Sequence, residues 1–156
     1  MSNADQVALF ARLAVAIVLG AAIGLEREFR GHEAGVRTGS LVCVGAALFG
    51  EIGVHLGDPR IAASVVQGIG FLGAGLIFPR HNSVHGITTA ATMWVLAGVG
   101  LLVSERLWVT AVLLTIAIVL LLELFPWSNW VFERGVKTRA QKAARAGRSD
   151  VRTDIG

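Results

Sequence analysis

The sequence predicts an all-α integral membrane protein, a compact bundle of about five transmembrane helices. Of its 156 residues, 54% are hydrophobic and 16% are charged, a balance outside the usual range of soluble proteins. The mean hydropathy of +0.65 agrees. The apolar residues also form continuous runs that do not alternate with polar residues, and inside a bilayer such runs form helices.

Five apolar runs are each long enough to cross a hydrocarbon core of about 30 Å. They cover residues 7–25, 39–56, 62–78, 87–103 and 107–125. We therefore expect residues 1–130 to form the transmembrane bundle. Residues 131–156, which are rich in lysine and arginine, are expected to form a short basic cytoplasmic tail attracted to anionic lipid.

The basic residues predict an orientation with the N-terminus outside and the C-terminus in the cytoplasm. In that orientation eleven lysines and arginines of the connections and tail lie on the cytoplasmic side, and only Arg60 and Arg106 lie outside. Positive charge in short connections favours the cytoplasm. The same orientation puts Trp108 at one interface and Trp127 and Trp130 at the other, as in an aromatic belt.

The first two runs carry small residues at intervals of four. Ala16, Gly20 and Gly24 lie on one stripe of the first run, and Ala46 and Gly50 on one stripe of the second. This spacing lets two membrane helices approach closely. We expect these stripes to be helix contacts. The last run has large aliphatic residues all round, so we expect it at the lipid-facing edge.

The run at residues 62–78 is predicted to be the hub against which the other helices pack. It contains Gly68, Gly70, Gly73 and Gly75. Glycine is a poor helix former, and a membrane helix keeps it mainly where another backbone comes close. The alternative interpretation is a broken helix that lines a cavity, as in transporters.

Three polar side chains are predicted deep in the membrane. With a rise of 1.5 Å per residue, Arg12, Glu51 and Gln67 all fall roughly 4 to 6 Å to the outer side of the bilayer centre. Charges at that depth are costly unless they are paired or hydrated. We expect a buried Arg12–Glu51 ion pair that the Gln67 amide completes. Alternatively, Arg12 snorkels to the outer headgroups and Glu51 reaches the outer interface beside His55.

The connection at residues 26–38 mixes carboxylates with arginines. Glu26, Glu28 and Glu33 are three oxygen ligands of the kind that hold a divalent cation. Three arginines are interleaved with them, which favours a salt-bridge network instead. Thr88 and Thr89 begin the run at 87–103, where free N–H groups could receive an anion, although ordinary caps are the simpler interpretation.

Several functional classes lack any sequence support. We find no nucleophile with a base, phosphate loop or metal motif, so we expect no enzyme, cofactor or metal site. Cys43 is the only cysteine, which excludes an intrachain disulfide. The net charge of +3 arises from the connections and tail, so it indicates membrane lipid as a partner and not nucleic acid.

Two long stretches resemble the signature blocks of the MgtC/SapB family of bacterial inner-membrane proteins. They are GAAIGLEREFRGHEAGVRTGSLVCVGAALF and RIAASVVQGIGFLGAGLIFPRHNSVHGITTAATMWVLAGVGL. The resemblance covers roughly residues 7–125. The matching positions are Glu26, Arg27, Gly31, Gly35, Arg37 and Thr38 in the first block, and Arg60, Gln67, Gly68, Gly70, Gly73, Gly75, Gly86, Thr88 and Thr89 in the second.

The resemblance implies a multi-pass protein of the inner membrane linked to magnesium homeostasis and adaptation to low magnesium. It implies regulation through intramembrane contacts with a larger complex, for which the F-type ATP synthase is the candidate. Many members carry an ACT-like C-terminal domain, and residues 131–156 are too few to form one, so a short form is expected.

The residues themselves leave an alternative function open, a proton or cation channel or transporter that uses Arg12, Glu51 and Gln67. We also expect a homo-oligomer, most simply a dimer. The sequence holds more small-residue stripes than one five-helix bundle needs, and a second copy would use the surplus.

Overall fold

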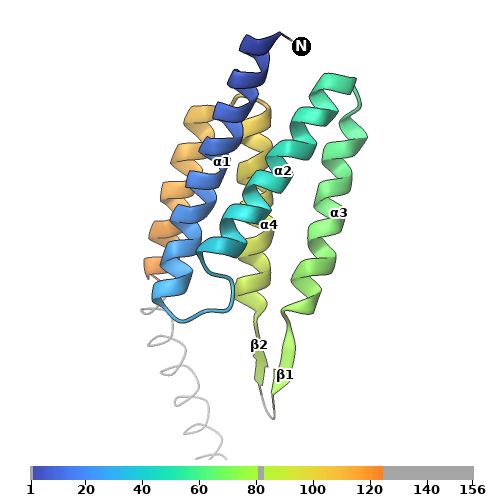
Figure 1. Ribbon diagram of the computed structural model, residues 1–156. Coiled ribbons are helices and arrows are strands. Elements are labelled where there is room, and N and C mark those ends of the chain that lie inside the picture. Colours follow the sequence, from blue (N-terminus) through green and yellow to red (C-terminus); the bar gives the residue numbers. More distant parts are fainter. Residues whose placement is uncertain (1, 81–82, 125–156) are drawn as a thin grey trace, which may run out of the picture. The chain divides into compact units, whose positions relative to one another are not determined.

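The structure, a computed structural model, describes residues 2–80 and 83–124. Within those residues the chain forms five helices and one two-stranded hairpin (Figure 1). They are α1 (Asn3–Phe29), α2 (Val36–Leu56), α3 (Pro59–Gly75), β1 (Phe78–Arg80), β2 (Ser83–His85), α4 (Ile87–Ser104) and the helix Trp108–Leu124. The contacts below belong to the compact unit Met1–Val119. The predicted basic tail, with Trp127 and Trp130, lies outside the described residues.

The helical prediction is confirmed, and three of the helices are long and apolar enough to cross a membrane. These are α1, α2 and α4, with 27, 21 and 18 residues. The helix Trp108–Leu124 is a shorter apolar helix, and α3 has 17 residues. That all five cross the membrane remains a prediction, as does the orientation.

Helix α1 extends beyond the apolar run at both ends because local hydrogen bonds hold its termini. The Ser2 hydroxyl accepts from the Asp5 N–H, and the Asp5 carboxylate accepts from the Ser2 N–H at 2.7 Å, which is a capping box. At the other end Gly31 has a φ of 70°, and the His32 N–H donates to the Arg27 carbonyl at 3.0 Å. This left-handed turn, which suits glycine, leads the chain toward α2.

Helices α1 and α2 pack backbone to backbone. A Cβ placed on Gly20 would lie 2.5 Å from the Gly39 carbonyl oxygen and 2.7 Å from the Cβ of Cys43. A Cβ placed on Gly24 would lie 2.7 Å from the Gly35 carbonyl oxygen. No side chain fits at these distances. The stripe of small residues in the first run therefore lies directly against α2.

The centre of the bundle is formed by α2 and α4. Helix α2 contacts α1, α3 and α4, and Figure 1 shows it between α1 and α3. The largest fully buried side chains include Met93, Leu96, Val99 and Val103, all on α4. Burial of apolar side chains against several neighbours marks these two helices as the core.

The prediction that the third helix is the hub is wrong. No described atom lies within 4 Å of a Cβ placed on Gly68, Gly70 or Gly75. Only Gly73 is in contact, at 3.6 Å from the Cβ of Ala90 on α4. Most glycines of α3 therefore have no close neighbour. The high glycine content of this helix did not indicate how many helices pack against it.

A hairpin that the sequence analysis missed connects α3 to α4. Helix α3 ends at Gly75, short of the predicted Phe78, and Phe78 instead pairs with His85 in an antiparallel ladder. Pro79, which cannot continue a helix, lies in the same strand. Gly86 then joins the hairpin to α4 with a φ of 87°, and a Cβ there would overlap the Leu76 carbonyl oxygen.

Candidate functional site

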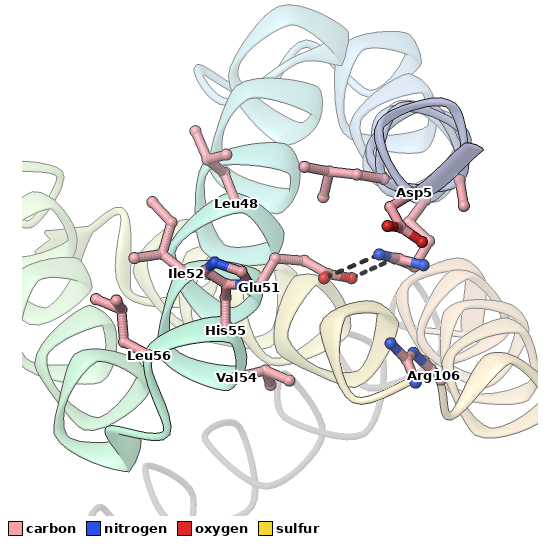
Figure 2. Close-up of a pocket in the computed structure, with 11 residues that line it drawn as sticks. Asp5, Leu48, Glu51, Ile52, Val54, His55, Leu56 and Arg106 are labelled. Atoms are coloured by element: carbon pink, nitrogen blue, oxygen red, sulfur yellow. Dashed lines mark hydrogen bonds and ion pairs between the residues drawn. The ribbon is translucent and has the colours of Figure 1, made fainter. Parts of the chain in front are cut away.

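A cavity of about 490 Å³ opens at the end of the bundle where α1 begins and α2 ends (Figure 2). We call it the vestibule. Its polar lining consists of Asp5, Arg12, Glu51, His55 and Arg106, and the rest is apolar. Figure 2 shows Glu51 reaching from α2 toward α1 across this space. Water that enters the vestibule therefore meets charged groups of three different segments.

Arg12 and Glu51 form an ion pair at the wall of the vestibule. Arg12 Nε pairs with Glu51 Oε1, and Arg12 Nη2 donates to Glu51 Oε2 at 3.1 Å. The two side chains are 17% and 10% exposed. A two-point contact between guanidinium and carboxylate fixes the geometry as well as the charge. The pair thus fastens α1 to α2 at the side of a cavity.

Gln67 is not part of this cluster. Its side chain is exposed on α3, which packs against α2 and α4, and Gln67 is not among the residues that line the vestibule. The expectation that its amide completes the Arg12–Glu51 pair is therefore wrong. The depth calculation gave its height along the membrane normal, but equal height does not put two residues on the same side of a bundle.

The predicted cluster did not include Asp5 or Arg106, and His55 entered only the alternative in which Glu51 reaches the outer interface beside it. His55 follows Glu51 by four residues, so a shared helix face was a usable signal. Arg106 lies in the turn that ends α4, with a φ of 62°, and its N–H donates to the Val103 carbonyl at 3.1 Å. No pattern in the sequence indicates that this turn faces the vestibule.

A second group of charged residues lies at the opposite end of the bundle. Glu26 and Arg27, near the end of α1, are 6% and 3% exposed. Arg27 Nη2 donates to the Thr89 hydroxyl at 2.8 Å, and Arg30 Nε lies 2.7 Å from Glu26 Oε1. We call Glu26, Arg27, Arg30 and Thr89 the Arg27 cluster. It brings together two stretches that the sequence analysis treated separately, the charged connection and the start of the fourth helix.

The other residues of that connection have local structural roles. Glu28 Oε2 accepts from the Val36 N–H at 2.9 Å and so caps α2. Gly35 makes room for it, because a Cβ there would lie 2.5 Å from the same oxygen. Arg37 and Thr38 are exposed and line a shallow cavity of about 600 Å³. At the start of α4, the Thr88 carbonyl accepts from the Thr92 hydroxyl at 2.8 Å.

The carboxylates of the connection do not converge on a metal site. Glu26 faces Arg30, whereas Glu28 caps α2. Among the described residues, no group of three His, Cys, Asp or Glu side chains is placed to hold a metal ion. The salt-bridge interpretation fits this geometry better than the divalent-cation interpretation.

Between the vestibule and the Arg27 cluster, α1, α2 and α4 are closely packed, whereas an open apolar groove of about 660 Å³ lies between α2 and α3. Arg12 and Arg27 are separated by fifteen residues of α1, or about 22 Å along a helix. Within this layer Ala16, Ile23, Cys43 and Ala47 are fully buried. A Cβ on Gly100 of α4 would overlap the Cys43 carbonyl oxygen. The two charged ends are thus separated by apolar side chains and close backbone contacts.

Several known proteins are similar to this chain in sequence. The model of the MgtC family matches residues 13–129. The chain is 46% identical over 111 residues to the protein MgtC of Brucella abortus strain 2308, covering 69% of this chain and 47% of the relative. It is 48% identical over 106 residues to an uncharacterised protein of Synechocystis sp., covering 65% of this chain and 45% of the relative.

Another relative is YhiD of Escherichia coli K12, named as a candidate magnesium transporter. It is 40% identical over 126 residues, covering 73% of this chain and 59% of YhiD. No solved structure matches the chain. The chain spans about half the length of the first curated relatives it matches. The apolar helices and the family match together identify a multi-pass membrane protein, and the chain belongs to the MgtC family.

Proposed function

We propose that this chain is a small regulatory protein of the bacterial inner membrane, linked to adaptation to low magnesium. It acts through contacts within the membrane with a larger complex, and the F-type ATP synthase is the candidate that the family resemblance suggests. The link to magnesium rests on the family and on the name of YhiD. In this proposal all five helices cross the membrane, the N-terminus and vestibule face outward, and the C-terminus is cytoplasmic.

The observation that carries the proposal is the packed layer between the two charged ends. A transport route needs polar or hydrated groups along its length, because ions and unpaired charges are costly in an apolar medium. Here fully buried apolar residues and close backbone contacts fill the space between α1, α2 and α4, and among the described residues Ser64 is the one polar side chain that lines the groove between α2 and α3. A protein that works by helix contacts has no need of such a route, so this packing supports regulation over transport.

A surface suited to helix contact is available on α3. Phe71 is 82% exposed, and Gly68 and Gly70 on the same helix have open space before them. Small residues on an exposed membrane helix let another backbone approach closely. We propose that this face meets the larger complex. The chain is also proposed to form a homodimer, and a monomeric detergent-corrected mass by light scattering would contradict that part.

Site-specific photo-crosslinking in cells tests the contact. A photoreactive amino acid replaces Phe71 on α3 or, as a matched control, Val109 on the helix Trp108–Leu124, which is also strongly exposed. We expect Phe71 adducts with a subunit of one membrane complex and no such adduct from Val109. Inverted vesicles that contain the chain should then show reduced ATP-driven proton pumping. Equal adducts at both positions, or unchanged pumping, would contradict the proposal.

A proton or cation channel is the second candidate, because the vestibule brings water to Glu51 from one end. Liposomes that hold the purified chain test it, with proton and magnesium flux as the readouts. The regulatory proposal expects no flux above empty vesicles. Flux that Glu51→Gln abolishes, and that the exposed control Glu33→Gln leaves intact, would instead establish transport through the Arg12–Glu51 region.

A further inference from the structure

Arg27 is a buried cation whose hydrogen-bond partner is a neutral group. It is 3% exposed, its Nη2 donates to the Thr89 hydroxyl, and its Nε lies buried without a hydrogen-bond partner. The carboxylate next to it in sequence, Glu26, pairs instead with Arg30. Among the described residues, no carboxylate lies within ion-pair distance of Arg27. Glu26 attracts Arg27 electrostatically, but no hydrogen bond or ion pair joins the two side chains. The Nε edge of Arg27 therefore has no acceptor among the described residues, although a buried charge normally has one.

The positive end of a long helix meets the same guanidinium. Helix α4 has 18 residues, and its N-cap, Gly86, makes no side-chain hydrogen bond to the first turn. The first-turn N–H groups of Ile87, Thr88 and Thr89 have no partner within the helix, and the helix dipole adds partial positive charge there. Because Arg27 Nη2 donates to the hydroxyl of Thr89 in this turn, the guanidinium lies close to the positive end of the helix.

We infer that Arg27 and the first turn of α4 bind a phosphate group. The free edge of a guanidinium and the N–H groups of a helix start are both donors that match phosphate oxygens. One anion between them would supply the acceptor for the Nε edge of Arg27 and cap α4. Neither the packed centre nor the proposed contact face of α3 requires this site, so it goes beyond the proposed function.

Two sources can supply the phosphate, the headgroup of an anionic phospholipid or free phosphate. Exposed apolar side chains of the same helix ends, Leu25, Phe29 and Ile87, would accompany the acyl chains of a lipid. Binding would join the end of α1 to the start of α4. Since only the folded state presents the site, occupancy should raise the thermal stability of the protein.

Binding to the purified, delipidated full chain in detergent tests the inference. The probes are phosphatidylglycerol, diacylglycerol with the same acyl chains and no phosphate, and inorganic phosphate against chloride at equal ionic strength. Native mass spectrometry reports lipid adducts, and thermal unfolding reports stabilisation. We expect adducts and stabilisation with phosphatidylglycerol and not with diacylglycerol. Stabilisation by inorganic phosphate that also displaces the lipid would assign the site to a soluble anion.

Variants separate this site from general attraction to positive charge. Arg27→Gln should weaken phosphatidylglycerol binding at least tenfold, whereas Arg37→Gln, an equal charge change at an exposed position of the same end, should leave it unchanged. Arg27→Lys keeps the charge, loses the planar fork and should weaken binding by about tenfold. If wild-type protein prefers phosphatidylglycerol no more than diacylglycerol and ignores phosphate, the inference is overturned even where Arg27→Gln does not fold.

Discussion

Arg12 and Glu51 are the residues whose pairing the structure makes easiest to test. Each is mostly buried and holds the other by two contacts, so either charge alone would lie in the bundle without a partner. Reversing one charge, as Arg12→Glu or Glu51→Arg, should destabilise the protein by about 3 kcal/mol, the low end for a buried pair because the vestibule admits water. The double swap should recover much of that loss.

Thermal unfolding in detergent measures the stability of the two single variants and of the double variant. Glu33→Arg, a charge reversal at an exposed position of the α1–α2 connection, is the control and should change stability little. A double swap that is no more stable than either single variant would show that Arg12 and Glu51 do not depend on each other. The ion pair would then be incidental to how α1 and α2 are joined.

At this scale the sequence predicted the pair and missed the Arg27 cluster. Helical rise puts Arg12 and Glu51 at one height, and the small-residue stripes give each helix a face to pack with. The helical rise does not give a residue's position around the bundle axis. For this reason the prediction wrongly included Gln67 in the cluster with Arg12 and Glu51. Arg27 and Thr89 are 62 residues apart, and only the packing of α1 beside α4 brings them into contact.

Helix α1 and helix α3 show that the same residue type has different consequences in two elements. Gly20→Ala should destabilise the protein by about 2 kcal/mol, because the new methyl group would meet the Gly39 backbone and push α1 from α2. Gly70→Ala on α3 meets no described atom and should be neutral or stabilising by about 0.5 kcal/mol through helix propensity. The shift in unfolding temperature of each variant tests the contrast.

If the Gly70→Ala variant were as unstable as the Gly20→Ala variant, Gly70 of α3 would have to be closely packed. That packing would have to come from another chain, since no described atom of this chain is near. The unfolding temperature of the Gly70→Ala variant, measured in a cross-linked dimer and in a monomeric preparation, would then show whether the packing comes from a second copy of the chain. Equal effects in a monomeric preparation would contradict the arrangement of α3 described above.

The helix boundaries could be predicted only where they coincide with the ends of apolar runs. The cores of α1, α2 and α4 follow directly from hydropathy, whereas their ends depend on caps such as Ser2 and Asp5. The hairpin escaped prediction because Phe78 extends the apolar run, so hydropathy continued past the true end of α3 at Gly75. Pro79 was the signal that a helix stops there.

At the scale of the whole unit Met1–Val119, two charged ends are joined by close packing of α1, α2 and α4. The vestibule opens at one end, and the Arg27 cluster buries charge at the other. The regulatory proposal needs helix contacts between these two ends and no route for ions, and α1, α2 and α4 are in close contact over this distance. The proposal also depends on every helix crossing the membrane.

Cysteine labelling tests the topology on which that account depends. In a Cys43→Ser background, single cysteines at Glu33, Leu56, Val84 and Glu105, all exposed, report on the four connections. With the N-terminus outside and five spans, a membrane-impermeant maleimide should label positions 56 and 105 in intact spheroplasts, and positions 33 and 84 only after permeabilisation. Position 84 shows whether α3 spans the membrane. Labelling of both positions 56 and 84 in intact spheroplasts would mean that α3 does not cross the membrane. The reverse pattern at all four positions would overturn the orientation that the basic residues predict.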